Sequence, residues 1–234
     1  MPEPHPATVA ALPEKIRILD KRLQEIAERF PQAVSASSLA AEDMIITARI
    51  AVLALPLRVI TLDTGRLHPE TAALITAVRR RYPDLAFAVF TPDTEAAAAF
   101  DGTYGAGAVY ESVAKRQACC RIRKIEPLNR ALNGAPAWLT GQRRSQSVTR
   151  TDLCFEEWDE ARQCAKFNPI FDWEDDDVWA FVQTADVPLN ALYAQGYPSI
   201  GCEPCTLPVK AGEDIRAGRW WWEQKDSKEC GLHQ

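Results

Sequence analysis

The sequence lacks any long apolar stretch, and no run approaches the roughly 18 residues that a membrane-spanning helix requires. Its first residues, M-P-E-P-H-P-A-T-V-A-A-L-P, also lack the charged start and the apolar core of a signal peptide. We therefore expect a cytoplasmic protein. Because thiols stay reduced in that compartment, the seven cysteines are not expected to form a disulfide framework, and metal binding or catalysis becomes the better hypothesis.

An excess of positive charge is also missing. The formal net charge is -5, which argues against a general nucleic-acid-binding protein, because such proteins gain much of their affinity from a basic surface. One basic cluster is usually a solvated surface, but three clusters beside cysteine or glycine motifs favour a site for a small anionic ligand. The three clusters are Arg121, Arg123 and Lys124; Arg143, Arg144 and Arg150; and Lys210, Arg216 and Arg219.

Internal repeats and low-complexity segments are absent, and one domain is the default for 234 residues. Residues 13–30 carry apolar side chains at steps of three and four, which predicts an amphipathic helix. Further helices are predicted at 40–55, 68–82 and 175–184, and strands at 33–37, 57–63, 85–90 and 135–141. This alternation predicts an α/β fold, in which helices flank a mostly parallel sheet. Ligands of such sheets bind at the carboxyl ends of strands, where loops 35–43, 62–67 and 139–147 would lie.

The chain changes character near Asp152, where the alternation weakens and aromatic and acidic residues become common. After Gly212 few apolar residues remain outside the tryptophans at positions 220–222. We therefore expect one α/β domain over residues 1–211, followed by a mobile carboxyl-terminal tail over 212–234. The tryptophans could form a closure contact over the site, a subunit interface or simple core, with core as the default; homo-oligomerisation stays open.

Four of the seven cysteines form two pairs, Cys119 with Cys120 and Cys202 with Cys205. A C-x-x-C pair alone is ambiguous, because zinc sites, redox disulfides and iron–sulfur sites share it. Adjacent cysteines are more selective: neighbouring residues in a helix diverge by about 100°, so both thiolates reach one zinc ion with difficulty. A four-iron cluster offers a separate iron to each thiolate. An iron–sulfur cluster is thus the leading interpretation, with structural zinc and inert buried thiols as alternatives.

The remaining cysteines stand alone. Cys154 and Cys164 have neighbours typical of strands, so we expect them to be small buried residues. Cys230 lies in the polar tail, near Lys228 and His233, whose positive charge could favour its thiolate. A terminal cysteine is often incidental. A nucleophile on a flexible arm, however, could attack a bound ligand and then reach a partner, which a cysteine in the core could not do.

Five stretches together resemble a known family: C-C-R-I-R-K-I-E-P-L, L-T-G-Q-R-R-S-Q-S, S-I-G-C-E-P-C-T, R-A-G-R-W-W-W and the closing E-C-G-L-H. From about Ala33 to His233 they are similar to the assimilatory sulfonucleotide reductases, specifically the cluster-containing adenylyl-sulfate reductases. The resemblance implies a fold related to the adenine nucleotide alpha-hydrolases, which is PP-loop related, and a [4Fe-4S] cluster. It also implies that Cys230 attacks the sulfur of adenosine 5'-phosphosulfate. AMP departs, Cys230 becomes an S-sulfocysteine, and thioredoxin then releases sulfite from it.

The family's functional residues map onto this chain motif by motif. Four cysteines match the cluster ligands: Cys119, Cys120, Cys202 and Cys205. Lys124, Arg216 and Arg219 match residues that hold the phosphosulfate, and Arg143 and Arg144 lie in a loop near it. Forked guanidinium groups suit this task, since they orient phosphate and sulfate oxygens and neutralise the departing AMP. His233 matches a family residue to which we assign no role, and the cluster is expected to position Lys124 rather than to exchange electrons.

Glycine is missing from the stretch S-A-S-S-L-A-A-E-D, where pyrophosphatases of this fold group carry a Ser-Gly-Gly type loop that cradles a triphosphate. Ser35, Ser37 and Ser38 keep their hydroxyls, but the close backbone approach to several phosphates that glycine permits is not provided. The loop therefore fits a ligand with one phosphate better than ATP. Leu62 and Asp63, at the end of the next predicted strand, would lie near the adenosine.

The leading hypothesis is a thioredoxin-dependent adenylyl-sulfate reductase, and alternatives stay open beside it. The substrate could instead be 3'-phosphoadenosine 5'-phosphosulfate. A protein of another class, an iron–sulfur sensor or electron carrier that binds nucleotide without turnover, would make Cys230 dispensable. A transfer-RNA thiolase shares the fold group, but it requires an ATP loop and a basic face, and the sequence shows neither.

Overall fold

The computed structural model describes residues 4–146, 151–210 and 212–223. The chain divides into two compact units, each built from several segments. The first unit comprises residues 1–61, 73–88 and 134–190, and the second comprises 62–72, 89–133 and 191–234. Within the described ranges, no helix combines the length and the apolar character needed to cross a bilayer.

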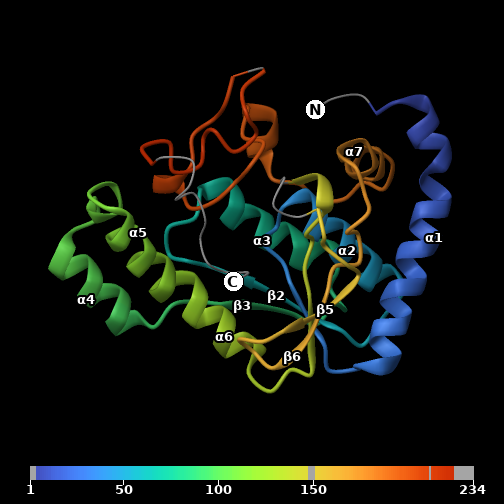
Figure 1. Cartoon of the computed structure of the whole chain (residues 1–234), viewed down its shortest axis with the longest axis horizontal. Helices are drawn as coiled ribbons and strands as arrows, with labels where there is room; N and C mark the ends of the chain where they lie inside the picture. Colours follow the sequence, from blue (N-terminus) through green and yellow to red (C-terminus); the bar gives the residue numbers. More distant parts are fainter. Residues whose placement is uncertain (1–3, 147–150, 211, 224–234) are drawn as a thin grey trace. The chain divides into compact units, whose positions relative to one another are not determined.

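A six-stranded sheet organises the α/β part of the chain (Figure 1). Its strands are β1 (Val34–Ala36), β2 (Arg58–Leu62), β3 (Phe87–Phe90), β4 (Ala137–Leu139), β5 (Glu156–Asp159) and β6 (Cys164–Phe167). They lie in the order β3-β2-β1-β4-β6-β5. Strand β1 runs parallel to β2 and to β4, and β4 runs parallel to β6, whereas β5 and β6 are antiparallel. The predicted α/β fold with a mostly parallel sheet is confirmed.

The antiparallel β5–β6 pair is an element that the sequence analysis does not anticipate. Strand β5 consists of the residues E-E-W-D, of which Trp158 is 56% exposed, so no apolar alternation marks it. It is a strand because it pairs along its whole length with β6, from Glu156 opposite Phe167 to Asp159 opposite Cys164. Backbone pairing with a neighbour, rather than burial of its own side chains, therefore defines this edge of the sheet.

Three helices of the first unit pack together (Figure 1). Helix α1 (Pro6–Arg29) packs on α7 (Asp175–Thr184), which also packs on α2 (Ala41–Val52). The apolar stripe of α1 buries Leu12, Leu19, Leu23, Ile26 and Ala27. The helix begins earlier than predicted, because Pro6 occupies the first turn, where its missing N–H is not needed, and the His5 side chain accepts a hydrogen bond from the nitrogen of Ala7.

Helix α7 has the predicted bounds and the predicted acidic start. Its first turn contains Asp175, Asp176 and Asp177, which the positive end of the helix dipole favours. Glu174 and Asp177 form a reciprocal capping box that satisfies backbone N–H groups at the helix start. Local sequence therefore fixes the position of this helix, and with it the position of Asp175 in the polar network described below.

The second unit is mainly helical. It contains α4 (Thr94–Tyr104), α5 (Val113–Cys120) and α6 (Glu126–Leu132), while α3 (Pro69–Arg81) begins in it and ends in the first unit. Helices α5 and α6 are continuous through a π-helical turn, residues Arg121–Ile125. Such turns widen a helix locally and are frequent at functional sites. Here the wide turn follows directly after Cys119 and Cys120.

The segment after Gly212 is packed at Trp220, although residues 212–215 are exposed. Trp220 is 1% exposed and lies in a cluster with Cys202, Cys205 and the half-buried Trp222. The expectation of a tail from residue 212 rested on the scarcity of apolar residues, but a single tryptophan buries enough surface to hold a segment. Residues 224–234 lie outside the described residues, and the predicted organisation into one domain and a tail stays a prediction.

Candidate functional site

The first unit brings two polar loops to the same edge of its sheet. Strands β1 and β4 are parallel neighbours, with Ser35 opposite Leu139, so both strands end at this edge. The loop after β1 carries Ser37 and Ser38, and the loop after β4 comprises residues 140–146. Ser35 and Ser37 are buried, whereas Ser38 is exposed. The serines assigned to the nucleotide thus lie at or beside the carboxyl end of a central strand.

Ser38 is tied to Asp43 in the first turn of α2. The backbone nitrogen and the hydroxyl of Ser38 both donate to Asp43 Oδ2, at 2.7 and 2.6 Å. The backbone of Gly141 also hydrogen-bonds to this carboxyl, which joins the two loops. Burial raises the pKa of Asp43 to about 6, against the effect of these hydrogen bonds. Position 141 requires glycine, because a Cβ there would clash with the Asp43 carboxylate.

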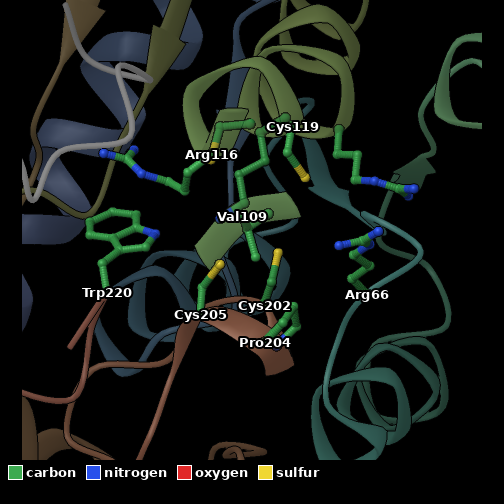
Figure 2. A pocket seen from close by; sticks show the side chains of 11 residues that line it. Arg66, Val109, Arg116, Cys119, Cys202, Pro204, Cys205 and Trp220 are labelled. Carbon is green, nitrogen blue, oxygen red and sulfur yellow. The ribbon is translucent and has the colours of Figure 1, made fainter. Parts of the chain in front are cut away.

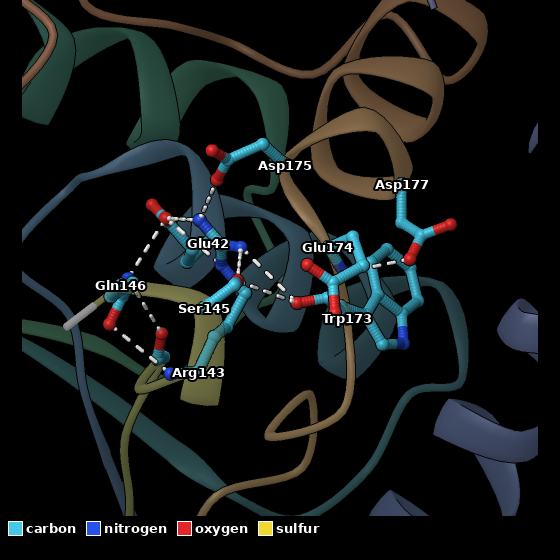
Figure 3. A network of polar contacts seen from close by, with 9 residues as sticks. Glu42, Arg143, Ser145, Gln146, Trp173, Glu174, Asp175 and Asp177 are labelled. Carbon is cyan, nitrogen blue, oxygen red and sulfur yellow. Dashed lines mark hydrogen bonds and ion pairs between the residues drawn. The ribbon is translucent and has the colours of Figure 1, made fainter. Parts of the chain in front are cut away.

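Arg143 is the centre of a polar network in the second of these loops (Figure 3). Its side chain is 4% exposed, and Nη2 donates to Glu42 Oε1 at 2.8 Å and to Asp175 Oδ1 at 2.6 Å. Gln146 Nε2 donates to the same Glu42 oxygen at 2.9 Å, and Arg143 Nη1 donates to Ser145 Oγ at 2.6 Å. Burial acts to lower the pKa of Arg143, but the two carboxylates raise it overall. An anionic ligand at Arg143 would therefore compete with carboxylates that already bind it.

Arg144 has a different environment. It is exposed, its Nε donates to the carbonyl oxygen of Leu153 at 2.8 Å, and its guanidinium carbon lies 4.6 Å from the ring centroid of Phe171. A guanidinium stacked on an aromatic ring keeps part of its charge available to solvent. The two arginines predicted near the phosphosulfate therefore differ, one buried among carboxylates and the other at the surface.

The second unit brings the two cysteine pairs together. Cys119 and Cys120 are the last residues of α5, while Cys202 and Cys205 stand at the two ends of one 3-10 turn. All four are between 7% and 9% exposed and line one pocket. Figure 2 shows the sulfur of Cys119 facing those of Cys202 and Cys205 across this pocket. The hydroxyl oxygen of Thr64 lies 3.3 Å from Cys202 Sγ.

The buried thiols of this pocket resist ionisation. Burial, together with the neighbouring Cys202 and Cys120, raises the pKa of Cys205 to about 12, against the effect of nearby cations. Burial also raises the pKa of Cys119, and Arg66 and Arg123 act in the opposite direction. Burial therefore opposes the ionisation of Cys119 and Cys205, which a bound metal would have to offset.

Four cationic residues also line the pocket, and no acidic residue is found among its described lining: the cations are Arg66, Arg116, Arg123 and Lys124. Two of them share one carboxylate in α4. Arg66 Nη2 lies 2.6 Å from Asp101 Oδ1, and Arg123 Nη2 lies 2.7 Å from Asp101 Oδ2. Asp101 thus holds both guanidinium groups at the wall of the pocket. All the charged side chains of the described lining are therefore cations, and Asp101, outside the lining, balances part of their charge.

Arg219 is held beside the second cysteine pair. It forms an isolated antiparallel bridge with Thr206, and its Nη1 donates to the carbonyl oxygen of Ile200 at 3.2 Å. Gly201 allows this approach, because a Cβ at that position would lie 2.6 Å from Arg219 Nη2. The guanidinium also lies 4.7 Å from the ring centroid of Trp220. Because Gly201 has no side chain, there is room for Arg219, which the family resemblance assigns to the phosphosulfate.

The other predicted substrate-binding residues of the second unit lie in turns. Leu62 ends β2, and Asp63 follows it, with Oδ1 accepting a hydrogen bond from the nitrogen of Gly65 at 2.9 Å. Arg216 is half-buried, and its backbone nitrogen donates to Asp214 Oδ1 at 2.7 Å. Their predicted contacts with a nucleotide stay predictions, as do those of the serines, Lys124 and the remaining arginines.

Two predicted residues, Cys230 and His233, lie outside the described residues. Among the isolated cysteines, burial is confirmed for Cys164 and is wrong for Cys154, which is exposed. The thiol of Cys154 donates to the carbonyl oxygen of Asp152 at 3.3 Å, in a turn at the surface. The neighbours of Cys154 in the sequence are typical of a strand and gave no sign of this turn.

Sequence reasoning missed several residues at the cysteine pocket. Arg66 and Arg116 line it, and Trp220 closes one end (Figure 2). A signal for Arg116 was available, because it precedes Cys119 and Cys120 by three and four residues, the spacing of neighbours on one helix face. No comparable signal marks Arg66, which reaches the pocket through a tertiary contact with Asp101.

The donor set of the pocket suits a group with several metal atoms. Its four thiols line one pocket, so thiolates from two distant segments can reach the same bound group. Thiolate is the ligand that iron–sulfur clusters use. The donor set is therefore chemically compatible with such a cluster.

Comparison with known sequences gives one family and a consistent set of relatives. Residues 32–208 match the phosphoadenosine phosphosulfate reductase domain. The chain is 57% identical, over 96% of its length and 92% of the relative's, to an adenosine 5'-phosphosulfate reductase of Neisseria meningitidis serogroup A. It is 54% identical to the protein of the same name from Burkholderia cepacia, over 97% of this chain and 92% of that one.

Comparison with solved structures supports the same fold. A phosphoadenylyl-sulfate reductase from Candida auris, solved with phosphate, superposes with a TM-score of 0.70 at 26% identity, over 81% of this chain and 90% of that one. A yeast FAD synthetase superposes with a TM-score of 0.58 at 16% identity, over 86% of this chain and 68% of that one. The second likeness concerns the α/β fold alone.

Proposed function

Because this chain belongs to the phosphoadenosine phosphosulfate reductase family, we propose that it reduces adenosine 5'-phosphosulfate to sulfite and AMP in sulfate assimilation. The observation that carries the proposal is the meeting of two distant cysteine pairs in one buried pocket lined by cations. It is supported by relatives named for this activity that match the chain almost end to end.

We propose a [4Fe-4S] cluster as the cofactor, held by four thiolates: Cys119, Cys120, Cys202 and Cys205. When bound, the cluster would supply a fixed anionic centre rather than a pair of electrons, because thiol chemistry completes the reduction without it. Arg66, Arg116 and Arg123 would balance the charge of the thiolates. Lys124 would be held at the same pocket and directed toward the phosphosulfate.

The first step would be an attack by the thiolate of Cys230 on the sulfur of the phosphosulfate. A bond forms between the cysteine sulfur and the sulfonate sulfur, the bond from that sulfur to the phosphate oxygen breaks, and AMP leaves with the electron pair. Lys124, Arg216 and Arg219 would neutralise the oxygens of the departing phosphate. Ser35, Ser37 and Ser38, with Leu62 and Asp63, would bind the nucleotide.

The second step would require a protein dithiol, which we propose to be reduced thioredoxin. One thiolate of thioredoxin attacks the sulfur of Cys230, and sulfite leaves with the electron pair of the broken sulfur–sulfur bond. The second thiol of thioredoxin then resolves the mixed disulfide, so that Cys230 returns as a thiol and thioredoxin becomes a disulfide. This exchange is consistent with a cytoplasmic location, where thioredoxin is kept reduced.

One observation raises a second candidate substrate. The Candida auris enzyme with the same fold is named for phosphoadenylyl sulfate, which carries an additional 3'-phosphate. That likeness is 26% in sequence, against 57% for the adenosine 5'-phosphosulfate reductase of Neisseria. Adenosine 5'-phosphosulfate, which lacks the 3'-phosphate, is therefore the substrate we propose, and both nucleotides are included in the test.

The decisive experiment is intact-protein mass spectrometry after anaerobic purification. Wild type, Cys230→Ser and the matched control Cys154→Ser are each mixed with adenosine 5'-phosphosulfate, or with its 3'-phosphorylated form, without reductant. We expect one SO₃ group to be added to wild type and to the control only, and to be released as sulfite by reduced thioredoxin. If no protein gains mass while nucleotide still binds, the reductase proposal fails and a nucleotide-binding iron–sulfur sensor takes its place.

A further inference from the structure

The second unit contains a buried ion pair that the mechanism above does not use. Arg116 in α5 pairs with Glu223, the last described residue before Cys230. The two side chains are 0% and 2% exposed. Arg116 Nε lies 2.9 Å from Glu223 Oε1, and Nη2 lies 2.9 Å from Oε2, so the guanidinium and the carboxylate form two parallel hydrogen bonds. This two-point geometry fixes the direction of both side chains.

The environment of this pair makes it hard to separate. A charge without a partner is strongly unfavourable inside a protein, so neither residue can leave the other without first reaching water. Other ion pairs within the described part of the second unit are more exposed. Lys115 and Glu111, for example, pair at the surface, with side chains 33% and 54% exposed. The Arg116–Glu223 pair therefore holds the end of the described chain against α5.

Arg116 is also part of the cysteine pocket. Burial acts to lower its pKa, but hydrogen bonds and charge from Glu223 and from Cys120 raise the pKa overall. Its guanidinium carbon lies 4.7 Å from the ring centroid of Trp220, and Figure 2 shows the two side chains together at one end of the pocket. Trp220 in turn packs with Cys202 and Cys205. One guanidinium therefore contacts a thiol of the pocket, the tryptophan that closes it and the carboxylate of Glu223.

The distance along the chain from this pair to Cys230 is short. Cys230 follows Glu223 by seven residues. An extended chain covers at most about 3.6 Å per residue, so Cys230 stays within roughly 25 Å of Glu223. Fixing one end of such a tether confines the other end and raises its concentration near the fixed point. A thiol that has to meet a bound sulfur atom depends on this confinement.

We propose that Arg116 and Glu223 are positioning residues for the nucleophile. They anchor the chain that leads to Cys230 on the helix that carries Cys119 and Cys120, and so confine the thiol to the neighbourhood of the cysteine pocket. The inference rests on the proposed function, because it assigns the anchor to the attack of Cys230 on adenosine 5'-phosphosulfate. It adds two residues that act on the nucleophile through the chain they anchor.

The test compares Glu223→Gln with wild type in a single turnover. Glutamine keeps the shape of glutamate but removes its charge. We expect the rate at which the Cys230 peptide gains an SO₃ group, at saturating nucleotide, to fall about 10- to 100-fold. The dissociation constant for AMP and the iron content should stay within about twofold of wild type, because Glu223, the residue that is changed, does not line the cysteine pocket. Glu111→Gln, which breaks the exposed pair with Lys115, is the matched control and should match wild type.

A second readout separates positioning from general damage. The rate at which iodoacetamide alkylates Cys230 without nucleotide should be unchanged in Glu223→Gln, since the intrinsic reactivity of the thiol does not depend on the anchor. Arg116→Lys keeps the buried charge but forms one hydrogen bond in place of two, and should slow the transfer by an intermediate factor.

The outcomes separate this inference from the proposed function. If wild type gains no SO₃ group, the proposed function fails. If wild type reacts and both variants match its rate, the function stands and the anchor is refuted. Loss of iron or of cooperative unfolding in both variants would show that the pair serves folding, which also overturns the positioning role.

Discussion

The two polar regions of this molecule both contain buried, paired arginines, but they differ in what else the arginines face. In the first unit, Arg143 is buried between Glu42 and Asp175, so its charge is balanced by carboxylates within the loop network. In the second unit, four cations line a pocket whose described lining is free of acidic residues. The thiols there carry no charge until they lose their protons, and burial, which raises the pKa of Cys119 and of Cys205, opposes this loss at both.

This difference indicates two kinds of site. The network around Arg143 is complete in the protein itself and holds two loops in a fixed shape at the edge of the sheet. The cysteine pocket combines thiols, which gain charge only by losing their protons, with four cations, three of which pair with Asp101 or Glu223 outside the lining. We therefore expect Arg143 to hold the loops in place and the cysteine pocket to receive a cofactor. The predictions below would break or sharpen this contrast.

Replacing one pocket cysteine should have the largest effect. In Cys202→Ser the hard hydroxyl oxygen replaces a soft thiolate, so we expect the bound iron and the visible absorbance of the purified protein to be lost, and activity with them. Iron analysis of the anaerobically purified variant checks this. Cys164→Ser, at a buried thiol of the first unit, should keep its iron. A full iron content in Cys202→Ser would remove the pocket from the cofactor assignment.

Breaking the network should destabilise the first unit. In Arg143→Leu the carboxylate of Glu42, with 14% side-chain exposure, loses its buried partner, and we expect the free energy of unfolding to fall by about 3 kcal/mol. Urea titration followed by tryptophan fluorescence measures it. Arg17→Gln breaks an exposed pair with Glu14 and should leave the unfolding curve unchanged. An undisturbed curve for Arg143→Leu would mean that Arg143 is a ligand-binding group rather than a structural one.

The pH dependence of stability should report on Asp43. Its pKa is raised by burial, so the folded state retains this proton to higher pH than the unfolded state does. The contribution to stability is therefore present at low pH and is lost as pH rises from about 4 toward about 6. Relative to Asp43→Asn, the wild-type free energy of unfolding should fall by about 3 kcal/mol over this window. Parallel curves for the two proteins between pH 4 and 7 would rule out the raised pKa.

Displacing Arg219 should have the smallest effect. A methyl group at position 201 would press on the Arg219 guanidinium, so Gly201→Ala should weaken binding of adenosine 5'-phosphosulfate by about tenfold while iron is kept. Isothermal titration of the Cys230→Ser background measures the affinity without turnover. Gly102→Ala, in α4 with open space around it, is the matched control and should bind as before. Equal affinities would take Arg219 out of the binding site.

Periodicity along the chain was enough to predict most of the fold. The helix at 175–184 has the predicted bounds, and the strands at β1, β2, β3 and β4 lie within their predicted ranges. The prediction was incomplete where a tertiary partner decides the structure. Strand β5 exists because β6 pairs with it, and Trp220 is buried because two cysteines of a distant segment pack against it.

The candidate site divides in the same way. Adjacency and C-x-x-C spacing were enough to single out the four cysteines, because thiol ligands are rare and their spacing is local. Arginines gave a weaker signal, since a basic residue in sequence shows neither which carboxylate it will meet nor whether it will be buried. Arg143 and Arg116 are both buried and paired with carboxylates. The sequence singled out Arg143 as a loop residue, but it did not single out Arg116.

The π-helical turn at Arg121–Ile125 makes chain length matter as much as residue identity. Such a turn holds one more residue than an α-helical turn, and each residue of a helix turns its successor by about 100°. Deleting a single residue there would restore a regular helix and rotate Cys119 and Cys120 by about 100° relative to α6. Insertions and deletions in this stretch should therefore be as rare among cluster-binding relatives as substitutions of the cysteines themselves.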